Sequence, residues 1–272
     1  MSKKVILITG ASSGMGKETA KVLLQQGHTV YSVARRIDQM QELKDLGGYP
    51  IQMDVTKESD IQHVVDTILQ KEGKIDVLWN NAGYGLYGAV EDIPVEEARR
   101  QFEVNVFGLA AITQKVVPYM REANAGTIIN TSSMGGKIYT PMGAWYHASK
   151  HAVEGFSDCL RLELKPFNIH VVVLEPGIIV TEFGDVMLQN LNQFSSTGAY
   201  AALTNKLVAA TRKMYDRGQG SKVTVVSKTI SKIVNSKKPS TRYRVGLWAK
   251  PMVWMRVYLG DRLFDKIVMS QV

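Results

Sequence analysis

Tyr146 and Lys150 have the types and the spacing for proton-transfer chemistry. They lie four residues apart at the start of an expected helix over Ala144–Phe167, so their side chains share one helix face. A phenol has an ordinary pKa of about 10 and is a poor base near neutral pH, but a neighbouring ammonium stabilises the phenolate and lowers that pKa. Such a phenol can exchange a proton with a carbonyl oxygen. Ser133 lies 13 residues upstream, just after an expected strand, and its hydroxyl could orient the same oxygen.

A glycine-rich segment follows the first expected strand, Val5–Thr9, and leads into a helical pattern. Its residues are Gly10, Ala11, Ser12, Ser13, Gly14, Met15 and Gly16. Glycines in such a turn let the backbone approach a pyrophosphate, whose charge is favoured at a helix N-terminus. A nucleotide-binding P-loop would need glycine at position 11 and Ser or Thr at position 18, where the chain has Ala11 and Glu18. The segment therefore predicts a dinucleotide site, with a plain glycine-rich turn as the alternative.

Two arginines, Arg35 and Arg36, follow the second expected strand, Thr29–Val33. At this place in dinucleotide sites an acidic residue binds the hydroxyls of the adenosine ribose. The chain has no carboxylate here, and a guanidinium can hold a 2′-phosphate through two hydrogen bonds. We therefore expect NADP(H) as the cofactor, with Arg35 as the stronger candidate because it comes first after the strand. The alternative is a pair of solvated surface arginines.

An alternation of short strands and longer helices must position these side chains. The expected strands are Val5–Thr9, Thr29–Val33, Ile51–Asp54, Val77–Asn80, Thr127–Thr131 and His170–Glu175. The expected helices are Gly16–Gln26, Ile37–Leu46, Glu58–Lys71, Val95–Met120 and Ala144–Phe167. Because the strands are continuous apolar runs, the alternation predicts an α/β fold with a single Rossmann-type, doubly wound parallel sheet and helices on both faces. Beyond them, residues 182–218 and Lys222–Val234 look helical, and Arg242–Val245 is a possible last strand before a C-terminal helix.

Further short motifs occur in a fixed order along residues 5–181. They are Thr9 with the glycine segment, Asp54-Val55, Asn80-Asn81-Ala82-Gly83, Asn105, the set Ser133, Tyr146 and Lys150, and Pro176-Gly177 with Thr181. With them the chain resembles the short-chain dehydrogenase/reductase family, in its NADP(H)-preferring subgroup of about 250 residues. The motifs cover about two-thirds of the chain. We expect one domain over residues 1–272, with a variable substrate lid and C-terminal region from about residue 182.

The resemblance implies an oxidoreductase that interconverts a carbonyl and an alcohol by hydride transfer with NADP(H). It implies that Tyr146 is the general acid/base, that Ser133 polarises the substrate oxygen, and that Lys150 binds the nicotinamide ribose and depresses the pKa of Tyr146. Asn105 would complete a proton relay through water. The residues expected to hold the cofactor are Gly10, Ser12, Ser13, Gly14, Met15, Gly16, Arg35, Arg36, Asp54, Val55, Asn81, Ala82, Gly83, Tyr146, Lys150, Pro176, Gly177 and Thr181. One departure is Ser13, which stands where some NADP-preferring relatives have a second basic residue.

Several other reactive residue types are expected to be structural. His147 and His151 have the spacing of two metal ligands on one helix face, but no third ligand or acidic residue is evident nearby, and we expect no metal. Cys159 is expected to be a buried helix residue and not a nucleophile. As the only cysteine it cannot form an internal disulfide, which favours a reducing compartment. Tyr84 and Tyr87 either line the mouth of the pocket or pack against the core.

The charge of the chain is unevenly distributed. In all, 33 basic and 25 acidic residues give a formal charge of +8, but residues 201–272 alone hold 15 basic and 3 acidic side chains. The overall composition is that of an ordinary globular protein, which excludes a largely disordered or collagen-like chain. The apolar run in the first ten residues is too short for a secretory leader, and no run of about 18 apolar residues occurs. We therefore expect a cytoplasmic protein.

The last third of the chain bears on substrate and partners. Apolar side chains between Phe183 and Tyr200 suit a lipophilic aldehyde, ketone or secondary alcohol, and helical core packing accounts for them equally well. The stretch Leu247–Arg256 could close the pocket or lie on an anionic membrane surface, but we favour a packed terminal helix. We expect a small-molecule substrate, no nucleic acid, and by analogy a homodimer or homotetramer formed through Val95–Met120 and Ala144–Phe167. The alternative function is a non-catalytic NADP(H)-sensing regulator or nucleic-acid-binding protein on the same fold.

Overall fold

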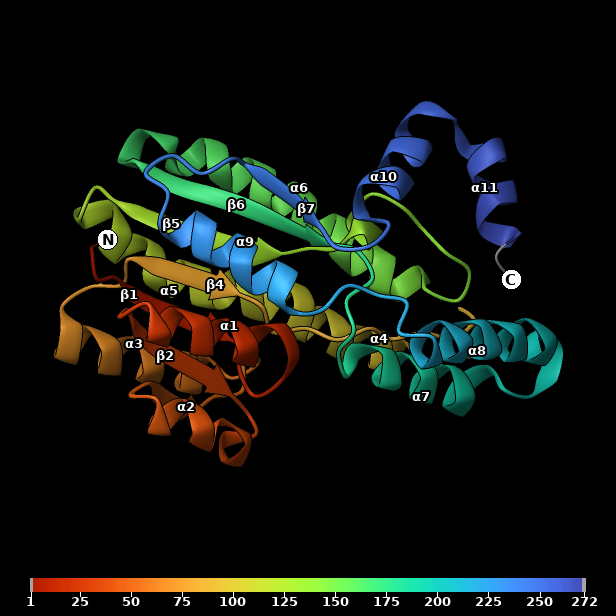
Figure 1. Cartoon of the computed structure of the whole chain (residues 1–272), viewed down its shortest axis with the longest axis horizontal. Coiled ribbons are helices and arrows are strands. Elements are labelled where there is room, and N and C mark those ends of the chain that lie inside the picture. The colour runs from red at the N-terminus through yellow and green to blue at the C-terminus, as the bar shows by residue number, and fades with distance from the viewer. Residues whose placement is uncertain (1, 271–272) are drawn as a thin grey trace.

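Seven parallel strands form one sheet in the computed structural model, which describes residues 2–270. Their order across the sheet is β3-β2-β1-β4-β5-β6-β7 (Figure 1). The strands are β1 (Val5–Thr9), β2 (Thr29–Ala34), β3 (Tyr49–Gln52), β4 (Val77–Asn80), β5 (Gly126–Thr131), β6 (Ile169–Pro176) and β7 (Arg242–Val245). The chain builds outward from β1 to β3, returns to β4, and then builds outward to β7, so the strand order reverses between β1 and β4. Ligands of such sheets bind at the carboxyl ends of the strands at this reversal.

Helices cover both faces of the sheet, which confirms the predicted doubly wound fold. On one face lie α1 (Gly14–Gln25), α2 (Gln41–Asp45) and α9 (Thr224–Val234), and on the other lie α3 (Glu58–Glu72), α5 (Leu109–Glu122) and α6 (Ala144–Leu164). Successive side chains of β1 enter the two cores alternately: Leu7 packs with the second group of helices, and Ile6 and Ile8 pack with the first. This two-sided burial explains why the strands are continuous apolar runs.

The long helix expected over Val95–Met120 is interrupted. The structure has α4 (Val95–Phe102), a π-helical segment η2 (Glu103–Gly108), and then α5. Gly108 packs closely against the segment that follows β3. A Cβ at this position would stand only 2.7 Å from the carbonyl oxygen of Val55. A π-helical segment adds a residue to one turn and is common at functional sites. Here it contains Asn105.

The remaining boundary differences are small. The third strand begins and ends two residues before the expected Ile51–Asp54, and Pro50 is tolerated within it because β3 is an edge strand. The expected helix Ile37–Leu46 is the 3₁₀ segment η1 (Ile37–Met40) followed by α2. Short 3₁₀ segments also follow β5 and α6, as η3 (Met134–Gly136) and η4 (Lys165–Phe167).

Two helical pairs project from the sheet at the carboxyl ends of its strands (Figure 1). The first is α7 (Phe183–Ser195) and α8 (Ala201–Asp216), joined through the 3₁₀ segment η5 (Gly198–Tyr200). The second is α10 (Ala249–Tyr258) and α11 (Asp261–Met269), where one C-terminal helix was expected. Gly260 separates the last two helices with a positive φ of 72°. Between residues 2 and 270, no helix has both the length and the apolar character needed to cross a membrane.

Candidate active site

A cavity of about 790 Å³ lies at the carboxyl ends of β1, β2 and β4, where the strand order reverses. Most of the residues expected to hold a cofactor line it. These are Gly10, Ser12, Ser13, Gly14, Met15, Arg35, Arg36, Asp54, Val55, Asn81, Ala82, Gly83 and Thr181. The structure therefore brings together segments that lie as far apart as residues 10 and 181.

The glycine segment is held against the segment after β4. Gly10 has a positive φ of 67°, and a Cβ there would stand 2.8 Å from Cα of Ala82. The Thr9 hydroxyl accepts hydrogen bonds from the backbone N–H groups of Asn81 and Ala82, each at 3.0 Å. Gly16 does not line the cavity; a Cβ there would stand 2.4 Å from the carbonyl oxygen of Gly10, so this glycine permits close packing of helix and turn.

Asn81 leaves one polar atom available to a ligand. Its Nδ2 donates to the carbonyl oxygens of Thr9 and Gly10, at 3.1 and 3.2 Å. Its Oδ1 is buried without a hydrogen-bond partner among residues 2–270. A buried acceptor in this state costs stability unless a ligand satisfies it. The residue lines the cavity, so the site fits a bound molecule with a hydrogen-bond donor.

The two arginines after β2 both line this cavity. Arg36 reaches back over the glycine segment, where its Nη2 donates to Oγ of Ser12 at 3.3 Å and to Oγ of Ser13 at 3.1 Å. The basic group that Ser13 lacks is thus supplied from β2. Arg35 lines the cavity with an exposed side chain. Glu182, which the sequence did not indicate, forms an ion pair with Arg36 at 3.3 Å.

A second cavity, of about 530 Å³, contains the three residues expected to perform proton transfer. Ser133, Tyr146 and Lys150 line it together with Pro176 and Gly177. It joins the first cavity, because both are lined by Met15, Asn81, Gly83, Tyr84, Thr181 and Phe183. The far end is largely apolar and is formed by α7, α8, α10 and α11, with Met187, Leu191, Leu207, Met214, Met252 and Val268. The three polar side chains therefore line a cavity that adjoins the first cavity and ends in apolar side chains.

The pKa of Tyr146 differs from expectation. Burial raises it to about 12, and the hydrogen bond with Ser133 only partly opposes this effect. We expected the ammonium of Lys150 to lower the pKa of Tyr146, but Nζ of Lys150 lies 5.9 Å from the centre of the ring and donates to the carbonyl oxygen of Thr131 at 2.9 Å. In this arrangement the phenol is protonated at neutral pH.

Lys150 is itself a buried cation. Burial lowers its pKa to about 8, and the negative charge of Glu154 opposes that shift. Glu154 lies one turn further along α6, so it belongs to the same helix face. Glu154 was not among the expected site residues, although its spacing of four residues from Lys150 was a usable signal.

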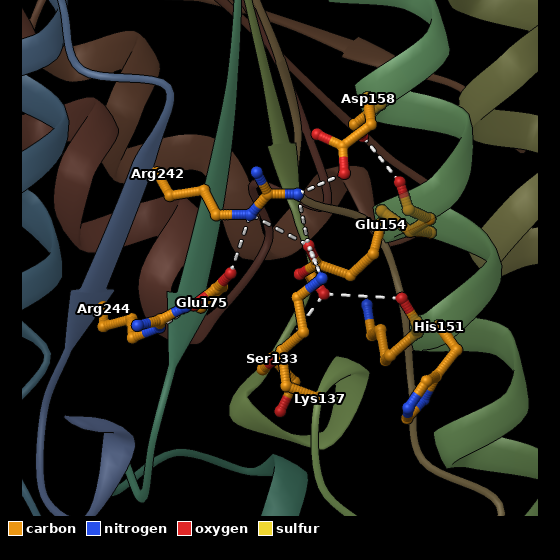
Figure 2. A network of polar contacts seen from close by, with 12 residues as sticks. Ser133, Lys137, His151, Glu154, Asp158, Glu175, Arg242 and Arg244 are labelled. Carbon is orange, nitrogen blue, oxygen red and sulfur yellow. Dashed lines mark hydrogen bonds and ion pairs between the residues drawn. The ribbon is translucent and has the colours of Figure 1, made fainter. Parts of the chain in front are cut away.

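Glu154 belongs to a buried ionic network that links α6 to the last strand (Figure 2). Nη2 of Arg242, on β7, lies 3.1 Å from Oε2 of Glu154 and 2.6 Å from Oδ2 of Asp158. Nε of Arg242 lies 3.1 Å from Oε1 of Glu175, the residue before Pro176. Lys137 and Arg244 complete the network, at 3.1 Å from Glu154 and 2.5 Å from Glu175. The network therefore joins the helix that carries Tyr146 and Lys150 to the segment that ends in Pro176 and Gly177.

Asn105 lies behind the two cavities and lines neither. Its Oδ1 accepts from the backbone N–H of Tyr84 at 3.1 Å, and its Nδ2 donates to the Tyr84 carbonyl at 3.0 Å and to Oγ of Ser149 at 3.1 Å. The side chain is therefore engaged within the protein. Its role in a proton relay stays a prediction.

The histidines of α6 are held by the protein. Nε2 of His147 accepts from the backbone N–H of Thr140 at 3.0 Å, and Nδ1 donates to the carbonyl oxygen of Gly135 at 2.9 Å. Nδ1 of His151 donates to the His147 carbonyl at 2.8 Å. Within residues 2–270, no group of three or more His, Cys, Asp or Glu side chains could hold a metal ion.

The structure also places Cys159 and Tyr87, whose positions were expected from the sequence. The prediction that Cys159 is buried is wrong, because it lies on the outer face of α6, directed away from the sheet, and is exposed. Tyr87 lines the apolar cavity, and its ring centre lies 5.6 Å from that of Tyr146. It therefore takes part in the pocket and in packing at once.

Comparison with known proteins establishes the family. Residues 4–193 match the model of the short chain dehydrogenase family, so the chain belongs to that family of oxidoreductases. It is 38% identical to a 3-ketodihydrosphingosine reductase of Bacteroides thetaiotaomicron over 262 residues, which cover 94% of each chain. It is 34% identical to VdlC of Helicobacter pylori, a probable short-chain type dehydrogenase/reductase, over 96% of this chain and 95% of that one.

Solved structures agree with this assignment. A short-chain dehydrogenase from Streptomyces avermitilis superposes with a TM-score of 0.81 at 32% identity, over 94% of this chain and 92% of that one. A serine dehydrogenase in complex with NADP⁺ has a TM-score of 0.79 at 29% identity, over 89% and 94% of the two chains. A 3-ketoacyl-(acyl-carrier-protein) reductase from Brucella melitensis in complex with NADH has a TM-score of 0.74 at 28% identity, over 88% and 94%. Proteins with similar folds thus bind NADP⁺ or NADH, so the cofactor preference of this chain has to be argued from its own residues.

Proposed function

We propose that the protein is an NADP(H)-dependent oxidoreductase that reduces a lipophilic ketone or aldehyde to an alcohol, or catalyses the reverse oxidation. The observation that carries this proposal is that Ser133, Tyr146 and Lys150 line the second cavity, which shares part of its lining with the first. One cavity has the residues to hold a dinucleotide, and the other is lined largely by apolar side chains. A carbonyl at the junction would lie beside both.

Tyr146, Ser133 and Lys150 each have a different role at the substrate oxygen. When bound, the nicotinamide supplies or accepts the hydride. Tyr146 donates a proton to the oxygen, and a pKa of about 12 keeps the phenol in the donor state at neutral pH. Ser133 orients the same oxygen through its hydroxyl. Lys150, held by the Thr131 carbonyl, provides positive charge near the ribose and the phenol.

Replacement of Tyr146 tests the assignment of the proton donor. In Tyr146→Phe the ring remains but no proton can be transferred, so we expect kcat to fall by roughly 10³-fold or more. Tyr146 contacts the reacting end of the site, so the Kd of NADPH, measured by fluorescence titration, should change little. Near-normal turnover in this variant would refute the assignment. Tyr84→Phe is the matched control. It removes the same phenol hydroxyl from another tyrosine that lines both cavities, and kcat should change little.

The preference for NADP(H) follows from the charges around the adenosine end. Arg35 and Arg36 both line the cavity, and Ser12 and Ser13 add hydroxyl donors beside Arg36. These groups complement a 2′-phosphate, and no carboxylate follows β2 to bind a free ribose hydroxyl. Asn81, with its free acceptor, and the segment up to Gly83 would hold the nicotinamide end.

Titration with both cofactors tests this preference. We expect a lower Kd for NADPH than for NADH, and each charge reversal, Arg35→Asp and Arg36→Asp, should lower that preference roughly 10- to 100-fold because one charged hydrogen bond is lost. Arg217→Asp makes the same charge change at an exposed position outside both cavities and should leave the ratio unchanged. Tighter binding of NADH, or a ratio unaffected in both cavity variants, would contradict the proposal.

The substrate is expected to be a long, lipophilic carbonyl compound. The similarity to a 3-ketodihydrosphingosine reductase suggests a long-chain 3-keto lipid, and the apolar end of the second cavity supports an alkyl chain. No Asp or Glu lines that cavity among the described residues, so a neutral ketone fits better than an aminoketone with a positive charge. NADPH oxidation with a neutral long-chain ketone and with 3-ketodihydrosphingosine, matched in chain length, separates the two.

We infer location and assembly from analogy. A cytoplasmic protein is consistent with the single cysteine, and the outer face of α6, with exposed Leu162 and Cys159, is available to a second copy. Light scattering of the purified protein measures the assembly directly. We expect the mass of a homodimer or homotetramer, and a monomer at high concentration would refute it.

A further inference from the structure

Helix α10 has two apolar faces, and only one of them is covered by the protein. Ala249, Met252 and Val253 are buried, the last two against Ile138 and side chains of α11. On the other side Trp254, Val257 and Tyr258 are 57%, 62% and 70% exposed. Spacings of three and four residues place them on one face, which we call the α10 stripe. The rings of Trp254 and Tyr258 lie 5.6 Å apart.

The side chains around the α10 stripe give the surface a positive charge. Lys250, Arg262 and Lys266 are exposed and form no ion pair with any residue from 2 to 270. Both carboxylates of α11 are engaged: Asp261 pairs with Arg256 at 2.6 Å, and Asp265 accepts a hydrogen bond from Tyr139 at 2.8 Å. Asp265 keeps its negative charge, so on α10 and α11 three unpaired cations stand against one unpaired anion among the described residues.

The α10 stripe lies beside the apolar cavity of the candidate active site. Met252, on the buried face of α10, and Val268, on α11, line that cavity, as does Trp248 at the start of α10. Trp248 is also 45% exposed, so it reaches from the cavity to the surface. Figure 1 shows α10 and α11 projecting together from the sheet.

We propose that the α10 stripe and its basic neighbours bind the surface of an anionic lipid bilayer. Trp and Tyr favour the boundary between water and lipid, and basic side chains add attraction to anionic headgroups. The occupant must be apolar at the stripe and negatively charged around it, which an anionic bilayer satisfies. Docking would place the mouth of the apolar cavity against the lipid phase, and this last consequence rests on the proposed function.

Vesicle binding tests the proposal with the full chain. We expect sedimentation with equimolar phosphatidylglycerol and phosphatidylcholine vesicles at about 0.1 M salt, and much weaker binding to phosphatidylcholine alone or at about 0.5 M salt. Trp254→Ser/Tyr258→Ser should lower the partition coefficient by about tenfold or more, because two exposed aromatic side chains no longer enter the interface. Leu46→Ser/Val90→Ser removes two exposed apolar side chains elsewhere and should bind as the unmodified chain does.

A charge pair provides the second arm. Lys250→Glu/Lys266→Glu should lower binding to the anionic vesicles by about tenfold or more, since each basic residue near the surface contributes about 1 kcal/mol. Lys237→Glu/Lys238→Glu changes the net charge equally in the exposed segment between α9 and β7 and should have a small effect. Tryptophan fluorescence with brominated lipids reports the contact directly, because quenching should be reduced in Trp254→Phe.

The outcomes separate the proposal from its alternatives and from the proposed function. Absence of binding to anionic vesicles, or equal loss in the stripe and control variants, would overturn it. Concentration-dependent self-association that disappears in Trp254→Ser/Tyr258→Ser would instead assign the stripe to a second copy of the chain, and tight binding to nucleic acid would assign the basic groups differently. Turnover of a short water-soluble ketone should be unchanged in all four double variants, so failure of catalysis would be seen apart from failure of membrane binding.

Discussion

Single side chains fix the loop that borders the candidate active site. His147 lies next to Tyr146 and binds Gly135 with one nitrogen and Thr140 with the other, so it clamps the segment that follows Ser133. Burial lowers the pKa of His147 to about 4, and the positive charge of His151 adds to this effect. The clamp therefore needs the neutral ring with its proton on Nδ1. Acid must disrupt it.

Replacing this histidine should change how stability depends on pH. The pKa of His147 is lower in the folded state than its ordinary value of 6.5, so its contribution is complete above about pH 6.5 and declines as the pH falls toward 4. From pH 7.5 to 4.5 the free-energy difference of unfolding between the unmodified chain and His147→Gln should shrink by about 3 kcal/mol. Chemical denaturation at both pH values measures it. His63→Gln, on the exposed side of α3, should give no such trend, and an equal trend in both variants would contradict the argument.

The candidate residues that could be predicted are those that belong to short motifs. Tyr146 and Lys150 share a helix face and Ser133 follows the strand before them, but this spacing is weak evidence alone, and the ordered motifs over residues 5–181 made the prediction specific. Arg242 and Glu175 lie 67 residues apart in sequence and are neighbours only because β7 pairs with β6. The pKa of Tyr146 was not predictable for a similar reason, since burial by several distant elements determines it.

At the scale of elements, the last strand stabilises the helix that carries the site. β7 has only four residues and lies at the edge of the sheet, yet Arg242 connects it to both α6 and β6. Glu154 and Glu175 are almost fully buried, and burial raises the pKa of Glu175, with the charge of Glu154 adding to it. The positive charge of Arg242 offsets part of the free-energy cost of burying two carboxylates.

Arg242→Met should therefore destabilise the protein more than loss of a surface charge would. In this variant, among the described residues, Glu154 keeps only Lys137 as a partner and Glu175 keeps only Arg244, so two nearly buried carboxylates are less well compensated. We expect a loss of about 2 kcal/mol in the free energy of unfolding at pH 7.5. Near pH 5 the loss should be smaller, because Glu175 takes up a proton more readily than an ordinary carboxyl group.

A second variant shows whether the buried charge is the cause. Arg242→Met/Glu154→Gln removes a carboxylate together with its partner, and it should be more stable than Arg242→Met alone. Arg217→Met, at an exposed position without an ion pair among the described residues, should lie within about 0.5 kcal/mol of the unmodified chain. If the double variant is the less stable one, the network acts through packing and not through charge.

The elements themselves were largely predictable where one residue pattern continued without interruption. The bounds of β1, β4 and β7 match those expected. Continuous apolar runs mark β1 and β4 as strands buried on both faces, whereas β7, with the sequence RYRV, is a half-buried edge strand. The π-helical segment η2 was missed, since the apolar spacing on either side of it still fits one helix. Only the contact between Gly108 and Val55 shows why the helix changes there.

At the scale of the whole molecule, the excess positive charge is concentrated outside the family motifs. Residues 201–272 contain 15 of the 33 basic residues and 3 of the 25 acidic ones. Arg242 and Arg244 are used inside the fold, where they balance buried carboxylates. Lys250 and Lys266 face solvent beside the α10 stripe. The basic residues of this region therefore have two physical roles: some balance buried carboxylates and others are exposed at the surface. The net charge alone does not show which role a residue has.

The first cavity of the candidate active site is lined by segments that lie far apart in the sequence, from Thr9 to Val186. Its lining begins in the glycine segment and ends in α7, whose neighbour Glu182 pairs with Arg36 across the cavity. A dinucleotide bound there would therefore lie beside the end of the first strand and the start of α7 at once. We expect NADPH at 100 times its Kd to stabilise the chain by about 2.7 kcal/mol. We also expect it to slow hydrogen exchange in residues 178–195 as well as in residues 10–36.

Hydrogen exchange measured by mass spectrometry can locate that protection. Residues 66–73 of α3 and its end lie outside both cavities and provide an internal reference that NADPH should not change. Tyr146→Phe should keep the full protection, because the phenol is required for proton transfer and not for binding of the adenosine end. Protection confined to residues 10–36 would mean that α7 does not close on the cofactor. In that case the ion pair between Arg36 and Glu182 would be a surface contact, and the helical pair would have to respond to the lipophilic substrate alone.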